Sequence, residues 1–157
     1  MSLKSTMFVA NWKMNGTSFN FKEVSKVGVF LNKNLKKYKK SIIFCPPLPL
    51  LTYFSKKNVN NNIQFGAQNL SNTSLSFGSA TGSISASMAK TSGAEYVILG
   101  HSESRSSGDS FLMIKNKILN ADKTKLKIIF CMGETLSQKK KEPVLSNFEK
   151  TNYRICI

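Results

Sequence analysis

Several kinds of residue are scarce in this chain, and each shortage argues against a class of protein. The 157 residues include only three cysteines, Cys45, Cys131 and Cys156, and no two of them have CxxC spacing. This odd number argues against a disulfide framework and a cysteine-based zinc site. No apolar run approaches the ~20 residues that a membrane-spanning helix needs, and the N-terminus lacks the apolar stretch of a secretory signal. We therefore expect a cytoplasmic protein that binds no membrane and no metal.

Acidic residues and arginine are also scarce. The chain has 8 Asp and Glu against 23 Lys and Arg, which gives a net charge of +15. Such a charge raises the possibility of nucleic-acid binding. However, Arg105 and Arg154 are the only arginines, so the forked side chain that best reads bases and phosphates is nearly absent. We expect a solvated basic surface that attracts small anions, with nucleic-acid binding as a weaker alternative.

What the chain does contain is a repeated pattern of a short apolar run followed by a helical spacing of apolar residues. With 41% hydrophobic and 20% charged residues, the composition is that of one globular domain, which we place at residues 1–157. The pattern predicts strands at 7–11, 41–45, 63–66, 96–99 and 126–131, and helices at 21–35, 53–57, 83–91, 110–120 and 137–150.

The alternation of strand and helix predicts a parallel sheet with right-handed crossovers. Most of the predicted strands are apolar throughout, as is typical of strands covered on both faces. The pattern alone leaves a doubly wound sheet and part of a barrel equally open. Neither the GxGxxG turn of a dinucleotide fold nor a GxxxxGK[ST] phosphate loop is present.

Polar side chains follow the C-terminal ends of the predicted strands, where parallel α/β folds bind their ligands. Among them is His101, the only histidine of the chain, whose imidazole is the side chain that changes charge near neutral pH. These polar residues are Asn11, Lys13, Gln68, Asn69, His101, Glu103 and Glu134. If the strands belong to a barrel, an amide, an ammonium, an imidazole and carboxylates converge at one mouth.

Five short motifs, in order and spacing, resemble the triosephosphate isomerase family. They are NWKMNG at 11–16, GAQN at 66–69, ATG at 80–82, YVILGHSE at 96–103 and CMGETL at 131–136. The resemblance runs from about residue 7 to 136. It implies a (β/α)8 barrel fold, here an incomplete barrel of five β/α units with parallel strands.

The resemblance also implies roles for the polar residues at the strand ends. The reaction would interconvert dihydroxyacetone phosphate and glyceraldehyde 3-phosphate through an enediolate, without a cofactor. Lys13 would offset the negative charge of the substrate, and Asn11 would donate a hydrogen bond to it. A neutral His101 would polarise the carbonyl and shuttle protons between the oxygens. Glu103, with Glu134, would support these groups without touching the substrate.

A third implication is a homodimer, because the family dimerises through the loop that here carries Thr81. The family usually has a glutamate after Thr-Gly and an arginine after His-Ser-Glu, which form an ion pair at that contact. In this chain Ser83 and Ser104 stand there. Replacing both partners avoids an unpaired buried charge, so we expect a dimer contact that is weakened rather than abolished.

The largest departure from the family is the catalytic base, a glutamate that the family carries in a segment after its sixth strand. Glu142-Pro143-Val144 matches three letters of that segment, but it follows a lysine run instead of an apolar strand, and we reject Glu142 as the base. We expect a truncated chain, equivalent to five-eighths of the family barrel, that has little activity alone. The alternative is a non-catalytic chain that associates with a partner subunit or a complementary fragment.

Overall fold

The structure is a computed structural model that describes residues 7–34, 41–133 and 154–156. Its strands form one sheet in which every neighbouring pair is parallel and the spatial order follows the chain. The strands are β1 (Met7–Asn11), β2 (Ser41–Cys45), β3 (Ile63–Ala67), β4 (Tyr96–Leu99), β5 (Lys127–Cys131) and β6 (Arg154–Cys156). The five strands expected from sequence are confirmed, and β6 is an addition at the edge beside β5.

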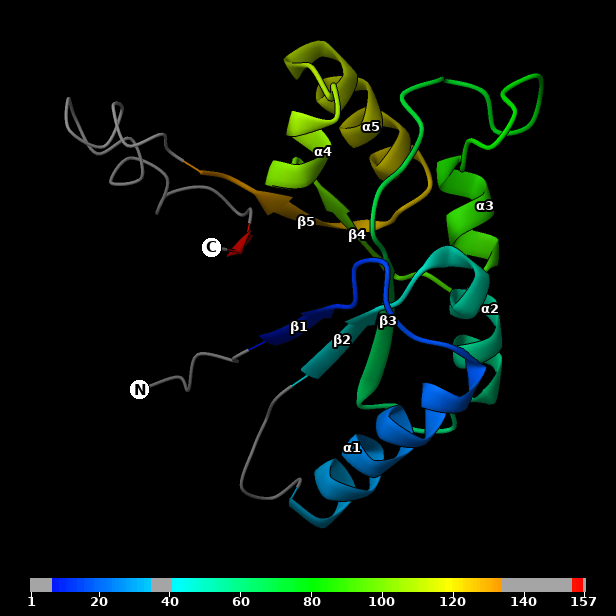
Figure 1. Cartoon of the computed structure of the whole chain (residues 1–157), viewed down its shortest axis with the longest axis vertical. Coiled ribbons are helices and arrows are strands. Elements are labelled where there is room, and N and C mark those ends of the chain that lie inside the picture. Colours follow the sequence, from blue (N-terminus) through cyan, green and yellow to red (C-terminus); the bar gives the residue numbers. More distant parts are fainter. Residues whose placement is uncertain (1–6, 35–40, 134–153, 157) are drawn as a thin grey trace, which may run out of the picture.

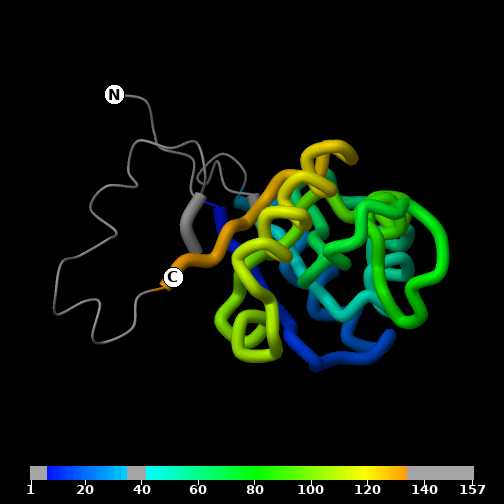
Figure 2. The backbone as a smooth tube through the Cα atoms, turned by 90° about the horizontal axis from the view of Figure 1, so that it is seen from above, coloured from blue at the N-terminus to red at the C-terminus, as the bar shows by residue number. Residues whose placement is uncertain are grey.

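The helices lie in an arc along one side of this curved sheet, from α1 through α2 and α3 to α5 (Figure 1). In the view from above, the green loop between β3 and α3 lies on the side of the molecule opposite to the orange segment of β5 (Figure 2). Their bounds are η1 (Ser18–Asn20), α1 (Phe21–Asn34), α2 (Leu48–Lys57), α3 (Ala86–Thr91), α4 (Ser102–Ser106) and α5 (Phe111–Lys123). None of these helices is long and apolar enough to cross a membrane.

Serine caps set the beginnings of two helices. The Ser85 hydroxyl accepts a hydrogen bond from the backbone N–H of Met88, and the Ser110 hydroxyl accepts one from the N–H of Met113. A capping serine lies outside the helix that it starts, so α3 begins three residues after the predicted start at 83. The short α4 was not predicted, and the helix predicted at 137–150 lies outside the described residues.

Apolar side chains cover both faces of the sheet, as the uninterrupted strands predicted. In β4, Val97 and Leu99 join the cluster between the sheet and the helices, which also contains Phe54 of α2. Tyr96 and Ile98 of the same strand point to the other face and join a second cluster. This second cluster also holds Ile43, Cys45 and Ile129, with Met7, Val9 and Cys131 packed against it. Double coverage fixes the strands and thereby the loops at their C-terminal ends.

Candidate active site

Two of the residues expected at the strand ends form a direct ion pair. Lys13 follows β1 and Glu103 lies in α4, immediately after β4, yet the Lys13 Nζ donates to the Glu103 Oε1 over 2.7 Å. Both side chains are more than half exposed, at 53% and 61%. The predicted proximity of Lys13 and Glu103 is thus present in the structure, with the ammonium held at a solvent-facing position.

The backbone of Lys13 is held in an unusual conformation. Its φ of 52° is left-handed, which costs a non-glycine residue about 1–3 kcal/mol. The Lys13 N–H donates to the Asn11 Oδ1 over 2.9 Å, and the Lys13 carbonyl accepts from the Gln68 Nε2 over 2.8 Å. Gln68 also donates to the Cys45 carbonyl over 2.8 Å. The turn is therefore tied to the ends of β2 and β3, and this fixes where the ammonium begins.

Asn11 contributes to this turn with one end of its amide. Its Oδ1 accepts the Lys13 N–H, which leaves the NH2 end as the donor that can face a ligand. Because Asn11 is the last residue of β1, the donor lies at the C-terminal edge of the sheet. This position suits a hydrogen bond to a substrate oxygen.

His101 caps the helix that carries Glu103. Its Nδ1 accepts a hydrogen bond from the Glu103 backbone N–H over 3.2 Å. A ring nitrogen accepts only where it carries no proton, so in this contact Nε2 is the nitrogen that bears the N–H. The same Nδ1 is 3.6 Å from the Glu103 Oε2, and the ring is 24% exposed. The Nε2–H is the group that can donate to an incoming carbonyl oxygen.

The carboxylate of Glu103 responds to these neighbours. The hydrogen bond from the Lys13 ammonium, together with the positive charge of that ammonium, lowers the pKa of Glu103 below its ordinary value. A carboxylate that accepts from an ammonium is favoured in its charged form. Glu103 therefore stays ionised at neutral pH and holds the Lys13 ammonium in place.

Arg105 ties α4 to the two strands beneath it. Its Nε donates to the Gly100 carbonyl over 2.7 Å, and its Nη2 lies 3.4 Å from the Cys131 carbonyl. Gly100 connects β4 to His101 with a φ of +74°, and a Cβ there would lie 3.0 Å from the Cys131 carbonyl. The glycine is needed for both its backbone angle and its space, and Arg105 fixes the turn that presents His101.

A buried polar cluster supports the same helix from behind. The Lys117 Nζ lies 2.6 Å from each oxygen of Asp109 and 3.0 Å from the Asn69 Oδ1. Asn69 in turn donates to the Ser104 Oγ over 3.3 Å. The Lys117 and Asp109 side chains are only 5% and 9% exposed. This cluster connects α5 and the segment after β3 to α4 at Ser104, which is three residues beyond His101.

The structure thus brings together four of the residues proposed from sequence: Asn11, Lys13, His101 and Glu103. Thr81 lies apart from them, on the exposed part of the long loop between β3 and α3. Glu134 lies outside the described residues, as does the rejected Glu142. The sequence analysis missed Arg105 and the pair formed by Lys117 and Asp109. It did find Gln68 and Asn69, through the GAQN motif, and Asn69 is a partner of Lys117.

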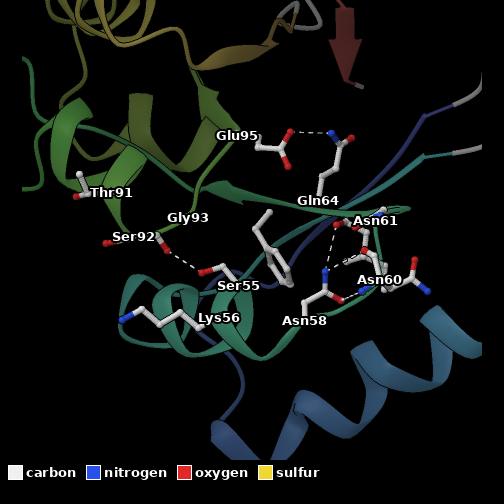
Figure 3. A pocket seen from close by; sticks show the side chains of 12 residues that line it. Ser55, Lys56, Asn58, Asn60, Asn61, Gln64, Thr91, Ser92, Gly93 and Glu95 are labelled. Carbon is white, nitrogen blue, oxygen red and sulfur yellow. Dashed lines mark hydrogen bonds between the residues drawn. The ribbon is translucent and has the colours of Figure 1, made fainter.

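A polar cavity of about 490 Å³ lies at the opposite end of the sheet, beside the beginnings of β3 and β4 (Figure 3). Its polar groups are largely paired with one another. The Gln64 Nε2 donates to Glu95 over 2.8 Å, and the Ser55 hydroxyl donates to the Ser92 carbonyl over 2.9 Å. In barrels the N-terminal strand ends serve stability, and these contacts brace β3, α2 and α3 in that way.

A sequence profile described as triosephosphate isomerase matches residues 6–153. The chain belongs to the triosephosphate isomerase family. It is 41% identical to the triosephosphate isomerase of Wolbachia pipientis wMel over 138 residues, which cover 88% of this chain and 53% of that protein. It is 35% identical to that of Alkaliphilus oremlandii, over 87% of this chain and 54% of that protein.

A solved member of the family shares the fold. The crystal structure of triosephosphate isomerase from Bartonella henselae matches with a TM-score of 0.76 and 32% identity, over 85% of this chain and 54% of that one. This match confirms that the curved sheet and its helices are part of a (β/α)8 barrel. The chain spans about half the length of the family relatives that it matches. Neither the family match nor these relatives favour the non-catalytic alternative.

Proposed function

We propose that this chain provides one part of a triosephosphate isomerase active site, for the interconversion of dihydroxyacetone phosphate and glyceraldehyde 3-phosphate. The observation that carries the proposal is that Glu103 contacts both Lys13 and His101. Its carboxylate accepts a hydrogen bond from the Lys13 ammonium, and its backbone N–H donates to the His101 ring. Family membership supplies the substrate class, and the site residues supply the chemistry.

In this proposal each side chain stabilises charge that develops on the substrate. The Lys13 ammonium stands opposite the phosphate and the enediolate oxygens, and the Asn11 NH2 donates to an oxygen of the substrate. The His101 Nε2–H donates to the carbonyl oxygen as it becomes negative. Donors placed in advance at such oxygens are among the largest contributions to catalysis. Glu103 keeps the ammonium in position without touching the substrate.

The residues described here provide electrophiles, and the reaction also needs a base that removes a carbon-bound proton. By the family resemblance that base is a glutamate in a segment beyond the matched motifs. We therefore propose that a polypeptide of these 157 residues has little turnover alone. A coupled assay on the purified chain tests this, and turnover near that of a full-length isomerase would contradict it.

A chimera tests the site itself. Residues 1–133 of this chain are joined to the C-terminal part of the Bartonella henselae relative, which shares the fold. We expect the chimera to isomerise triose phosphates, and Lys13→Ala or His101→Gln to lower kcat by about 10²–10⁴-fold, as removal of such groups does. Lys115→Ala, on an exposed face of α5, is the control. A folded chimera without activity would overturn the proposal.

We also propose the family's homodimer and a place in cytoplasmic glycolysis and gluconeogenesis. In support of the dimer, the loop that carries Thr81 presents Leu75 and Phe77 to solvent, 49% and 74% exposed. Exposed apolar groups on a projecting loop are typical of contact with another chain. Light scattering on the chimera should give the mass of a dimer, and Phe77→Ser should shift it toward the monomer. A monomeric chimera would contradict the dimer alone.

A further inference from the structure

A second surface of the molecule has the features of a binding groove and shares no residue with the site above. It lies between α2 and the segment formed by η1 and α1, and its volume is about 810 Å³. That volume is within the roughly 300–1,000 Å³ of ligand pockets in proteins. Nothing in the proposed isomerase chemistry uses it.

The floor and lip of this groove are apolar and aromatic. Phe21 packs edge-on against Tyr53 with ring centroids 6.2 Å apart, and against the fully buried Phe54 at 5.5 Å. The floor is thereby anchored to the core and already formed. Around it Phe19, Val29 and Tyr53 remain 84%, 55% and 41% exposed. Apolar groups gathered at one hollow are unlike the scattered exposed residues of an ordinary surface.

The rim of the groove is basic. Lys22, Lys26 and Lys57 line it together with serines, and no lining residue is acidic. The Lys57 Nζ lies 5.3 Å from the centre of the Phe21 ring and 5.1 Å from that of Tyr53. Lys26 pairs with Glu23 of its own helix at 3.2 Å. The apolar floor is therefore surrounded by cations, in a chain whose net charge is +15.

We propose that this groove binds an acidic peptide segment of a partner protein, with an apolar side chain on the floor and carboxylates at the lysine rim. An inorganic anion would leave the aromatic floor unused, and an uncharged apolar ligand would leave the lysines unused. A flat lipid surface would not reach the recessed ring of Phe21. Complementary charge at a rim steers association, and a buried aromatic or aliphatic anchor supplies most of the affinity.

The test uses the full chain and a fluorescein-labelled peptide in which glutamates surround one tryptophan and one leucine. Fluorescence anisotropy should show saturable binding. Replacing the glutamates by lysines, or the two apolar residues by serines, should abolish it. The Lys22→Glu/Lys57→Glu variant should weaken binding by about tenfold or more, since like charges at a rim oppose association.

Matched variants separate the groove from the overall charge. Lys115→Glu/Lys123→Glu on α5 changes the net charge equally. Phe19→Ser removes an apolar group, 84% exposed, from the groove, and Phe111→Ser on α5, at a side chain 82% exposed, is its control. Only the groove variants should weaken binding, with circular dichroism confirming that each variant folds. Equal loss in both sets would overturn the proposal. The proposal would also be overturned if the chain did not bind the peptide but bound phosphatidylserine vesicles with the same sensitivity to the groove variants.

Discussion

At the scale of single residues, Lys13 shows how the site is held. Its left-handed backbone is disfavoured, and hydrogen bonds on both its N–H and its carbonyl compensate. Its ammonium is then fixed by Glu103. A lysine side chain loses much rotamer freedom when it is held in this way, so its position reflects several contacts from three separate strand ends.

Glu103 gives the first prediction. Since its folded pKa is depressed, its ion pair contributes to stability above the unfolded pKa, and this contribution is lost as pH falls through the folded pKa. An NMR titration should place the Glu103 carboxyl below its ordinary value. Lys13→Met should move the midpoint upward, because the principal cause of the shift is removed. Lys26→Met, which removes the partner of Glu23, should leave Glu103 unchanged.

Gly100 gives the second prediction, with Gly82 as its control. Both have a φ of +74°, but a Cβ at Gly100 would lie 3.0 Å from a backbone carbonyl, whereas one at Gly82 meets nothing within 4 Å. Gly82→Ala should reduce the free energy of unfolding by about 1 kcal/mol through backbone strain alone. Gly100→Ala should cost about 2–3 kcal/mol because crowding is added. Equal losses in urea denaturation would contradict this account.

At the scale of elements, α4 depends on contacts more than on its own sequence. Its five residues, SESRS, show no apolar periodicity and few strong helix formers. The helix exists because His101 caps its beginning and because Arg105 and Ser104 bond to neighbouring elements. This explains why it was not predicted from sequence.

The longer elements were predictable for the opposite reason. An apolar run such as Ile42 to Cys45 has few alternatives to a buried strand, and α1 presents Val24, Val27 and Leu31 at helical spacing. The buried ion pair of Lys117 and Asp109 was not predictable, because lysine is almost always exposed. For the candidate site, the motifs indicated which residues meet, and the structure added the hydrogen bonds that orient them.

The third prediction concerns this buried pair. Asp109→Asn or Lys117→Met should each cost about 3–5 kcal/mol of unfolding free energy, because a buried charge loses its partner. The double variant Asp109→Leu/Lys117→Met should recover most of that loss, since neither charge remains. Lys26→Met at the exposed pair should cost about 0.5 kcal/mol or less. Three buried-site variants of equal stability would contradict the expectation.

At the scale of the whole molecule, curvature assembles the site. β1 and β4 are three strands apart in the sheet, which is about 14 Å in a flat arrangement at ~4.8 Å per strand. Yet side chains just beyond these two strands meet at 2.7 Å. The bend of the sheet around its inner apolar cluster therefore brings the residues of the candidate site within contact distance.

The net charge of +15 leads to the last prediction. Most of the described lysines are spread over α1, α2, α3 and α5, and the Arg105 guanidinium is engaged with two backbone carbonyls. Such a surface attracts phosphates without reading bases. Anisotropy with a labelled DNA duplex should give a Kd no tighter than about 10⁻⁶ M at physiological salt, equal for unrelated sequences and weakened by added salt. Because the lysines are dispersed, we expect no specific nucleic-acid site. Tight binding that discriminates between sequences would contradict this expectation.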